Sequence, residues 1–156
     1  MKKEFIKYII TALILCAFPL SLKGAPSEGM QQEAAMQICD RYNNQLKVAV
    51  PNVTDEGFAK AVAEGISVVD FGFRGCVWCG KIAPFFNHLA AKYGADGVKF
   101  FKYDVMGQQI AARTYGVGNV PSILVFKDGK LVSVQTGYTK LCTGLEDEIL
   151  KALERN

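Results

Sequence analysis

The chain alternates between short apolar runs and longer segments in which apolar residues recur at helical spacing. The runs predict strands and the longer segments predict helices. The expected strands are residues 47–50, 66–71, 98–105, 122–126 and 131–135, and the expected helices are residues 33–46, 55–63, 81–93, 108–115 and 145–154. This order predicts an α/β fold in which parallel strands joined by helical crossovers are followed by an antiparallel C-terminal hairpin.

The run 66–71 is almost entirely apolar and yet contains one acid, Asp70. Continuous apolar runs are typical of central strands that are covered on both faces. A carboxyl group inside such a strand is costly unless it has a partner or a function. Asp70 is therefore a candidate functional residue.

Two cysteines, Cys76 and Cys79, follow this strand at the start of the next helical segment. A helix N-terminus carries unpaired N–H groups and partial positive charge, so it favours a thiolate over a thiol. The thiolate is the nucleophile of disulfide exchange, and a second thiol one turn later can attack the mixed disulfide that forms. The spacing predicts a redox pair, with a purely structural disulfide as the alternative.

Composition and charge narrow the class of protein. The chain of 156 residues is half hydrophobic, which is typical of a globular domain with an appendage. Residues 1–24 carry four of the 18 basic residues and one of the 15 acidic ones, so the remainder is neutral with 14 of each. This balance gives no support for nucleic-acid binding.

The N-terminal segment 1–24 has a basic start, an apolar stretch from Tyr8 to Leu20 and then small or polar residues. This layout predicts a signal peptide cleaved after Gly24, and hence export to the periplasm or the extracellular space. A retained anchor is one alternative and lipidation of Cys16 is another, so membrane association is expected only if the segment is kept. Residues 25–46 are expected to be an N-terminal extension and residues 47–156 the folded domain.

Two further cysteines, Cys39 and Cys142, lie outside the redox motif. Independent buried thiols are the simpler interpretation, and a second disulfide that pins the N-terminal helix is the alternative. A zinc site is disfavoured, because the only histidine is His88 in a helical segment and the second cysteine pair lacks ligand spacing.

From about Lys47 to the C-terminus the chain resembles thioredoxin. The matching features lie at the same separations along the chain as in the family. They are the strand Val68-Val69-Asp70-Phe71, Pro84 five residues after the second cysteine, and Lys102 in the next strand. The segment Tyr115 to Ser122, which contains Val120-Pro121, and the turn Phe126 to Gly129 match as well. The resemblance implies the thioredoxin fold, with a mixed sheet flanked by helices.

The resemblance also assigns roles. It implies that Cys76 attacks, Cys79 resolves the mixed disulfide and Asp70 takes the proton from Cys79. It further implies that Pro121 follows a cis peptide bond and that the Val120 backbone pairs with an extended substrate. A structural ion pair between Asp70 and Lys102 is the alternative for the acid.

Four positions depart from the family pattern. Val77-Trp78 stands where the family keeps Gly-Pro, and glycines occupy two positions, Gly72 and Gly75, that carry aromatic residues in the family. Trp78 is expected either to shield the pair and contact substrate or to serve packing alone. Arg74 either adds positive potential at Cys76 or is a solvated loop residue.

These observations predict a thiol–disulfide oxidoreductase that reduces or exchanges protein disulfides outside the cytoplasm, with reduction favoured over oxidation. A disulfide oxidase or isomerase and a non-catalytic binding or chaperone module are the alternatives. No metal or organic cofactor is expected. A redox partner must recycle the pair, and by analogy it is a membrane electron donor.

Overall fold

The central strand β1 (Ile66–Gly72) organises the sheet. In the computed structural model, which describes residues 27–42 and 48–154, β1 pairs in parallel with β2 (Lys99–Asp104) and antiparallel with β3 (Ser122–Lys127). Strand β4 (Lys130–Thr136) continues the sheet antiparallel to β3, giving the order β2-β1-β3-β4. The first six residues of β1 are buried, as predicted for a central strand, and the mixed sheet confirms the expected fold class.

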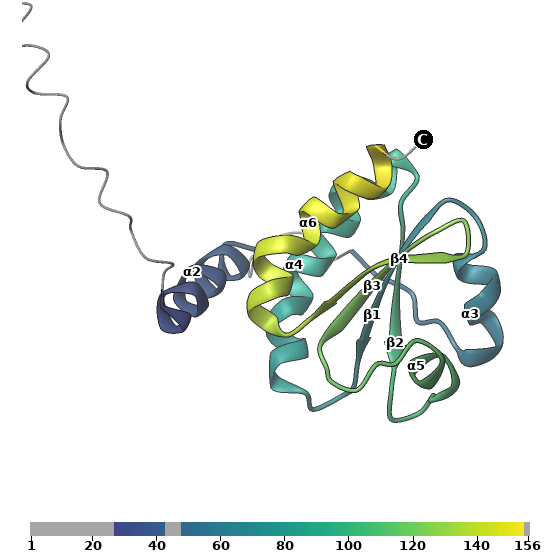
Figure 1. The fold of residues 1–156 in the computed structure, drawn as a ribbon, viewed down its shortest axis with the longest axis horizontal. Helices are drawn as coiled ribbons and strands as arrows, with labels where there is room; N and C mark the ends of the chain where they lie inside the picture. The colour runs from purple at the N-terminus through teal and green to yellow at the C-terminus, as the bar shows by residue number, and fades with distance from the viewer. Residues whose placement is uncertain (1–26, 43–47, 155–156) are drawn as a thin grey trace, which may run out of the picture.

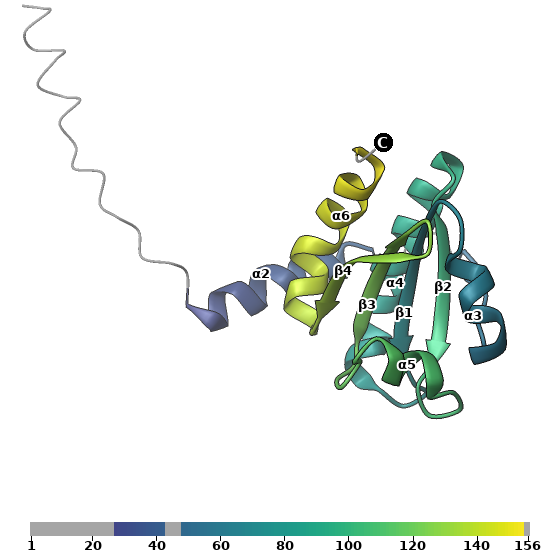
Figure 2. The ribbon, with the colours of Figure 1, turned by 45° about the vertical axis from the view of Figure 1, so that its right-hand side comes forward.

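Helices cover both faces of the sheet (Figures 1 and 2). Helices α4 and α6 lie on one face, and α3 and α5 on the other. The helices are α2 (Glu28–Asp40), α3 (Asp55–Val62), α4 (Val77–Tyr93), the 3-10 turn η1 (Gly94–Asp96), α5 (Ile110–Thr114) and α6 (Tyr138–Glu154). Helix α2 packs against α4 and α6, outside the layer that these two helices form.

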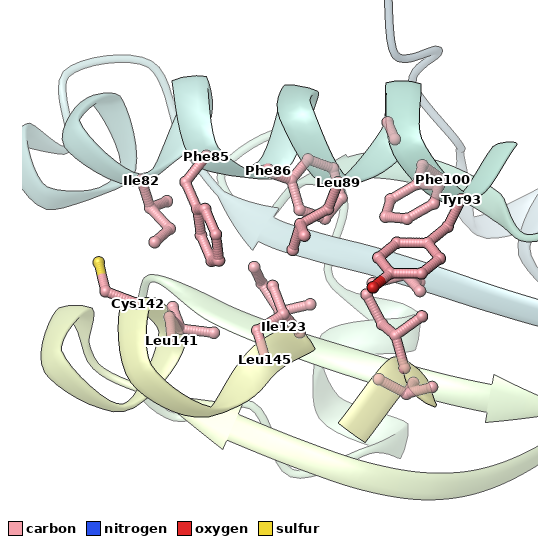
Figure 3. Close-up of a cluster of buried hydrophobic side chains, with 14 of the residues drawn as sticks. Ile82, Phe85, Phe86, Leu89, Tyr93, Phe100, Ile123, Leu141, Cys142 and Leu145 are labelled. Atoms are coloured by element: carbon pink, nitrogen blue, oxygen red, sulfur yellow. The ribbon is translucent and has the colours of Figure 1, made fainter. Parts of the chain in front are cut away.

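The larger part of the core lies between the sheet and helices α4 and α6. Figure 3 shows apolar side chains of α4, among them Ile82 and Phe86, directed toward Leu141 and Leu145 of α6. Their spacing places one face of each helix against the sheet, and all four are completely buried. Packing of these buried side chains holds α4 in place against the sheet, and the N-terminus of α4 carries the cysteine pair.

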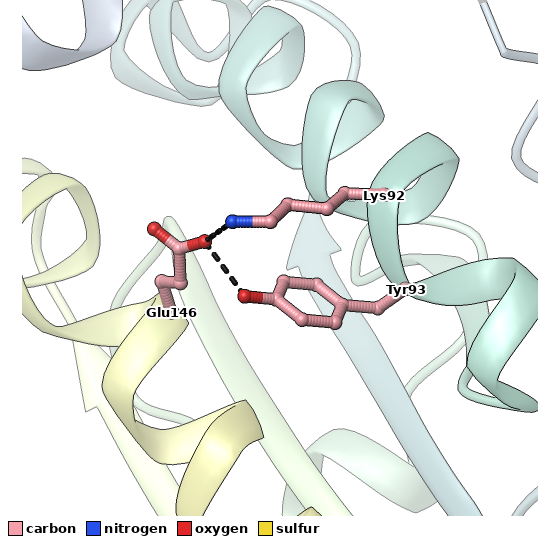
Figure 4. A network of polar contacts seen from close by, with 3 residues as sticks. All are labelled: Lys92, Tyr93 and Glu146. Carbon is pink, nitrogen blue, oxygen red and sulfur yellow. Dashed lines mark hydrogen bonds and ion pairs between the residues drawn. The ribbon is translucent and has the colours of Figure 1, made fainter.

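The last turn of α4 and the middle of α6 are joined by a polar contact. Lys92 lies 2.6 Å from the Glu146 carboxylate, and the Tyr93 hydroxyl donates to the same oxygen at 2.7 Å (Figure 4). These hydrogen bonds and the charge of Lys92 lower the pKa of Glu146, against the effect of its partial burial. An exposed ion pair of this kind contributes little to the free energy of folding. Its main effect is to align α4 with α6.

Cys39 of α2 and Cys142 of α6 form a disulfide bond, with Cα atoms 5.7 Å apart. The favoured interpretation from the sequence, two independent buried thiols, was therefore wrong. Both residues are buried as expected, but docking of α2 on α6 brings together positions that are 103 residues apart. The disulfide pins the N-terminal helix to the domain.

Several boundaries differ from the sequence prediction. Residues 48–50 are not a strand, and Lys47 lies outside the described residues. Asn52 instead forms a single bridge with Lys102, beside Pro51, which has no N–H to donate. The first helix spans Glu28–Asp40 and so begins before the predicted 33–46, with Ala35 and Cys39 as its buried positions, and residues 43–46 of that prediction lie outside the described residues.

Helix α6 begins at Tyr138, seven residues before the expected start. Burial of Leu141 and Cys142 stabilises this first part although Thr and Gly are poor helix formers. Helix α4 likewise begins earlier than predicted, at Val77, and continues through Pro84. The predicted hairpin turn is present, with positive φ at Asp128 and Gly129 as a two-residue type I′ turn requires.

The expectations for residues 1–24, including cleavage, anchoring and lipidation, concern residues outside those that the structure describes. Within 27–42 and 48–154, no helix is both long and apolar enough to cross a membrane.

Candidate active site

Cys76 and Cys79 meet at the N-terminus of α4. Cys76 is the N-cap residue, and its sulfur accepts a hydrogen bond from the Cys79 N–H at 3.1 Å. The two sulfurs are joined in a disulfide, and both residues are partly exposed. The helix terminus places unpaired N–H groups beside Cys76, which favours a thiolate there once the disulfide is reduced.

Asp70 is buried in the middle of the sheet, with 6% of its surface exposed. One carboxylate oxygen, Oδ1, has no hydrogen-bond partner among the described residues. Burial raises the pKa of the Asp70 carboxyl to about 7, and the charge of Lys102 on the neighbouring strand opposes that rise. A carboxyl with this pKa can both accept and release a proton near neutral pH.

The alternative of a structural ion pair is not supported. Lys102 is the register partner of Asp70 across β1 and β2, but the described part of the chain contains no ion pair between them. Lys102 therefore acts on Asp70 through its charge and not through a direct contact.

Asp70 and the cysteine pair open into one pocket of about 510 Å³. Its lining includes Asp70, Lys102, Cys76 and Cys79. Asp70 also lies two residues before Gly72 on the same face of β1, a separation of about 7 Å along a strand. The pocket thus joins a buried acid to the two sulfurs.

Gly72 makes room for Cys79. A Cβ atom added at Gly72 would lie 3.2 Å from the Cys79 sulfur and 3.3 Å from its Cβ, closer than ordinary contact. The sequence showed this glycine only as a departure from the family pattern. Its steric role depends on how α4 packs against β1, so no local signal could reveal it.

Val120 and Pro121 lie at the same end of the sheet as the cysteine pair. The peptide bond between them is cis, as the resemblance implied. Ser122, the next residue, pairs with Phe71 near the end of β1, where the chain leads into the cysteine loop. Pro121 is buried and Val120 is partly exposed, so the Val120 backbone borders the surface around the site.

Trp78 lies between the two cysteines, where it packs against helix α6 and stays partly exposed, and its contact with substrate stays a prediction. Its ring packs against the Tyr138 ring, with centroids 5.2 Å apart, and the Lys81 ammonium lies 4.6 Å from the ring centre. Even so, 39% of the residue remains exposed. Tyr138 was not recognised from the sequence, because its contact with Trp78 joins two helices that are far apart in the chain.

Arg74 lines the pocket, although it is exposed in the loop before Cys76. Two apolar residues of the same loop and helix, Phe73 and Val77, are also exposed, at 36% and 69%.

No cluster of three or more His, Cys, Asp or Glu side chains able to hold a metal occurs among the described residues. The groups that the site itself presents are the two sulfurs, the Asp70 carboxyl and nearby positive charge.

Comparisons with known proteins agree with this geometry. The family model for thioredoxin matches residues 49–151. Thioredoxin of Bacillus subtilis is 36% identical over 91 residues, which cover 58% of this chain and 86% of that protein. Thioredoxin C-2 of Corynebacterium nephridii is 38% identical over 94 residues, covering 59% and 86% of the two chains.

A solved structure of oxidised mitochondrial thioredoxin 3 from Saccharomyces cerevisiae superimposes with a TM-score of 0.60 at 26% identity, over 65% of this chain and 94% of that one. The chain belongs to the thioredoxin family. It is a thiol–disulfide oxidoreductase that acts on protein disulfides and exchanges electrons with redox partners.

Proposed function

We propose that the protein reduces protein disulfides outside the cytoplasm, with Cys76 as nucleophile, Cys79 as resolving thiol and Asp70 as proton acceptor. One observation carries the proposal. The buried carboxyl of Asp70, one oxygen of which has no hydrogen-bond partner within the described part of the chain, opens into the same pocket as a cysteine pair at a helix N-terminus.

The reaction begins with the reduced pair. The Cys76 thiolate attacks one sulfur of a substrate disulfide, and the other substrate sulfur leaves as a thiol after taking up a proton. Cys79 then gives its proton to Asp70 and attacks Cys76. The second substrate thiol leaves, and the Cys76–Cys79 disulfide remains. Two electrons have passed from the protein to the substrate, and a redox partner must return them.

The pocket supports a proton path between Cys79 and Asp70. A water molecule occupies about 30 Å³ in the liquid, far less than the pocket volume. Water can therefore connect the carboxyl to the resolving sulfur. The raised pKa of Asp70, about 7, suits transfer in either direction near neutral pH.

We assign substrate binding to the surface around Val120, Pro121 and Trp78. The partly exposed Val120 backbone offers hydrogen bonds to an extended peptide, and the exposed part of Trp78 offers an apolar contact. The dipeptide Val77-Trp78 between the cysteines is expected to set the reduction potential of the pair. The favoured direction is reduction of the substrate disulfide.

Export is part of the proposal. Disulfides persist in oxidising compartments and are rare in the cytoplasm, so the buried Cys39–Cys142 bond supports a location outside it. The signal-peptide pattern of residues 1–24 points the same way. A membrane protein that carries electrons outward would then recycle the pair. N-terminal sequencing of the protein from the periplasm of a Gram-negative host tests this, with Ala25 expected as the first residue.

Reduction of insulin tests the catalytic roles. Cys76→Ser is expected to abolish reduction, since it removes the thiolate that attacks the substrate disulfide. Cys79→Ser is expected to stop after one step and to accumulate a mixed disulfide, which makes it the matched control. Activity that survives Cys76→Ser would contradict catalysis by this pair and indicate a binding module instead.

A further inference from the structure

Helix α2 lies outside residues 49–151, the segment that matches the thioredoxin family model, yet it is fixed firmly to the domain. The Cys39–Cys142 disulfide joins its last turn to α6. Ala35 and Cys39 are buried at 0% and 1% exposure. Figures 1 and 2 both show α2 beside the N-terminal half of α6. Helix α2, which belongs to the N-terminal extension, therefore forms a surface beside α6.

A groove of about 380 Å³ runs between α2 and the start of α6. We call it the α2–α6 groove, and it is lined by Met30, Gln31, Ala34, Thr139 and Thr143. None of these side chains is charged. The Thr143 hydroxyl donates to the Thr139 carbonyl at 2.9 Å, so it is engaged by the helix backbone. Met30 is 59% exposed, which leaves an apolar surface open to solvent.

The groove adjoins the redox site through the first residues of α6. Thr139 follows Tyr138, whose ring packs against Trp78 at 5.2 Å. One residue earlier, the Gly137 N–H donates to the Pro121 carbonyl at 3.0 Å. The start of α6 thus contacts both the residue between the cysteines and the cis-proline segment.

We infer that the α2–α6 groove is an accessory substrate subsite, which receives a large apolar side chain from an extended segment of the protein disulfide substrate. The inference rests on the proposed attack of Cys76 on such substrates. Three observations favour this occupant over others: the lining is uncharged, Thr139 of the groove directly follows Tyr138, which contacts Trp78 of the redox site, and the groove volume lies within the range of about 300–1,000 Å³ that binding pockets span.

An extended peptide advances about 3.3 Å per residue, so a residue moved stepwise along it samples the surface beside the cysteine pair at that spacing. The test uses peptides whose single cysteine carries thionitrobenzoate in a mixed disulfide. The other positions are alanine, and one leucine is moved stepwise along either side of the cysteine. Release of thionitrobenzoate by the reduced protein gives the rate of attack.

The expected result is a rate about tenfold higher for leucine than for alanine at one preferred position, since filling an apolar pocket has effects of this size. Ala34→Glu is expected to bring this leucine-to-alanine ratio close to one, because it places a charge in the groove. Gln37→Glu adds the same charge at an exposed position of α2 and is expected to keep the ratio.

A wild-type protein with no positional preference would overturn the subsite, as would equal loss of preference in both glutamate variants. Concentration-dependent dimerisation that Ala34→Glu abolishes, without any leucine preference, would assign the groove to a second copy and also overturn it. Failure of the proposed function looks different, because the wild type would then release no thionitrobenzoate from any peptide.

Discussion

Replacing Asp70 by asparagine tests the buried acid most sharply, because the structure predicts opposite effects on stability and on activity. In the folded protein the pKa of Asp70 is about 7, against an ordinary value of 3.8. At a pH between these two pKa values, Asp70 has lost its proton in the unfolded chain and still holds it in the folded chain. The stability contributed by the protonated group is therefore complete below about pH 4 and is lost as the pH rises through about 7.

The magnitude follows from the pKa difference. One pH unit corresponds to about 1.4 kcal/mol, so a rise of about three units costs the folded protein about 4 kcal/mol once Asp70 is ionised. Asparagine cannot ionise, and its similar shape keeps the packing. Relative to wild type, Asp70→Asn should therefore gain about 4 kcal/mol in free energy of unfolding between about pH 4 and about pH 8.

Urea unfolding of both oxidised proteins across this pH range measures the difference, and titration of all other groups cancels in the comparison. Activity is expected to move the other way. Asparagine accepts no proton, so release of the mixed disulfide should slow by about 10²-fold, the effect of removing a general base. Parallel stability curves for the two proteins between about pH 4 and about pH 8 would refute a raised pKa at Asp70.

Two further predictions concern packing around the site. Replacing both Cys39 and Cys142 by alanine should lower the free energy of unfolding by about 2–5 kcal/mol, because the bond closes a loop over 103 residues. A loss below about 1 kcal/mol in urea unfolding would contradict that role. Gly72→Ala should destabilise the oxidised protein by about 1 kcal/mol or more, since its Cβ would lie 3.2 Å from the Cys79 sulfur. Gly80→Ala, whose Cβ would meet nothing within 4 Å, should stabilise helix α4 slightly, and equal behaviour of the two alanine variants would refute the steric argument.

The parts of the fold that were predictable are those encoded by local patterns. The apolar run 66–71 identified a central strand, and its single acid identified Asp70 as an unusual group. The positions of Cys76 and Cys79 at a helix start were also predictable, because strand, loop and helix follow one another without interruption.

Features that depend on docking of distant elements were not predictable. The Cys39–Cys142 bond requires α2 to lie on α6, and the weak apolar stripe of α2 gave no sign of where it packs. The early start of α6 follows from burial of Leu141 and not from local helix propensity. The contact of Trp78 with Tyr138 depends on that same early start.

The reduction potential of the Cys76–Cys79 couple tests the central claim most directly. Trp78 is the only tryptophan and lies between the two cysteines, so its fluorescence should report the redox state during equilibration with a thiol buffer. The account predicts a reversible two-electron couple near thioredoxin's potential of about −270 mV, as a donor of electrons to protein disulfides requires. A couple near about −120 mV would instead identify an oxidant, and a pair that does not cycle at all would contradict the catalytic account.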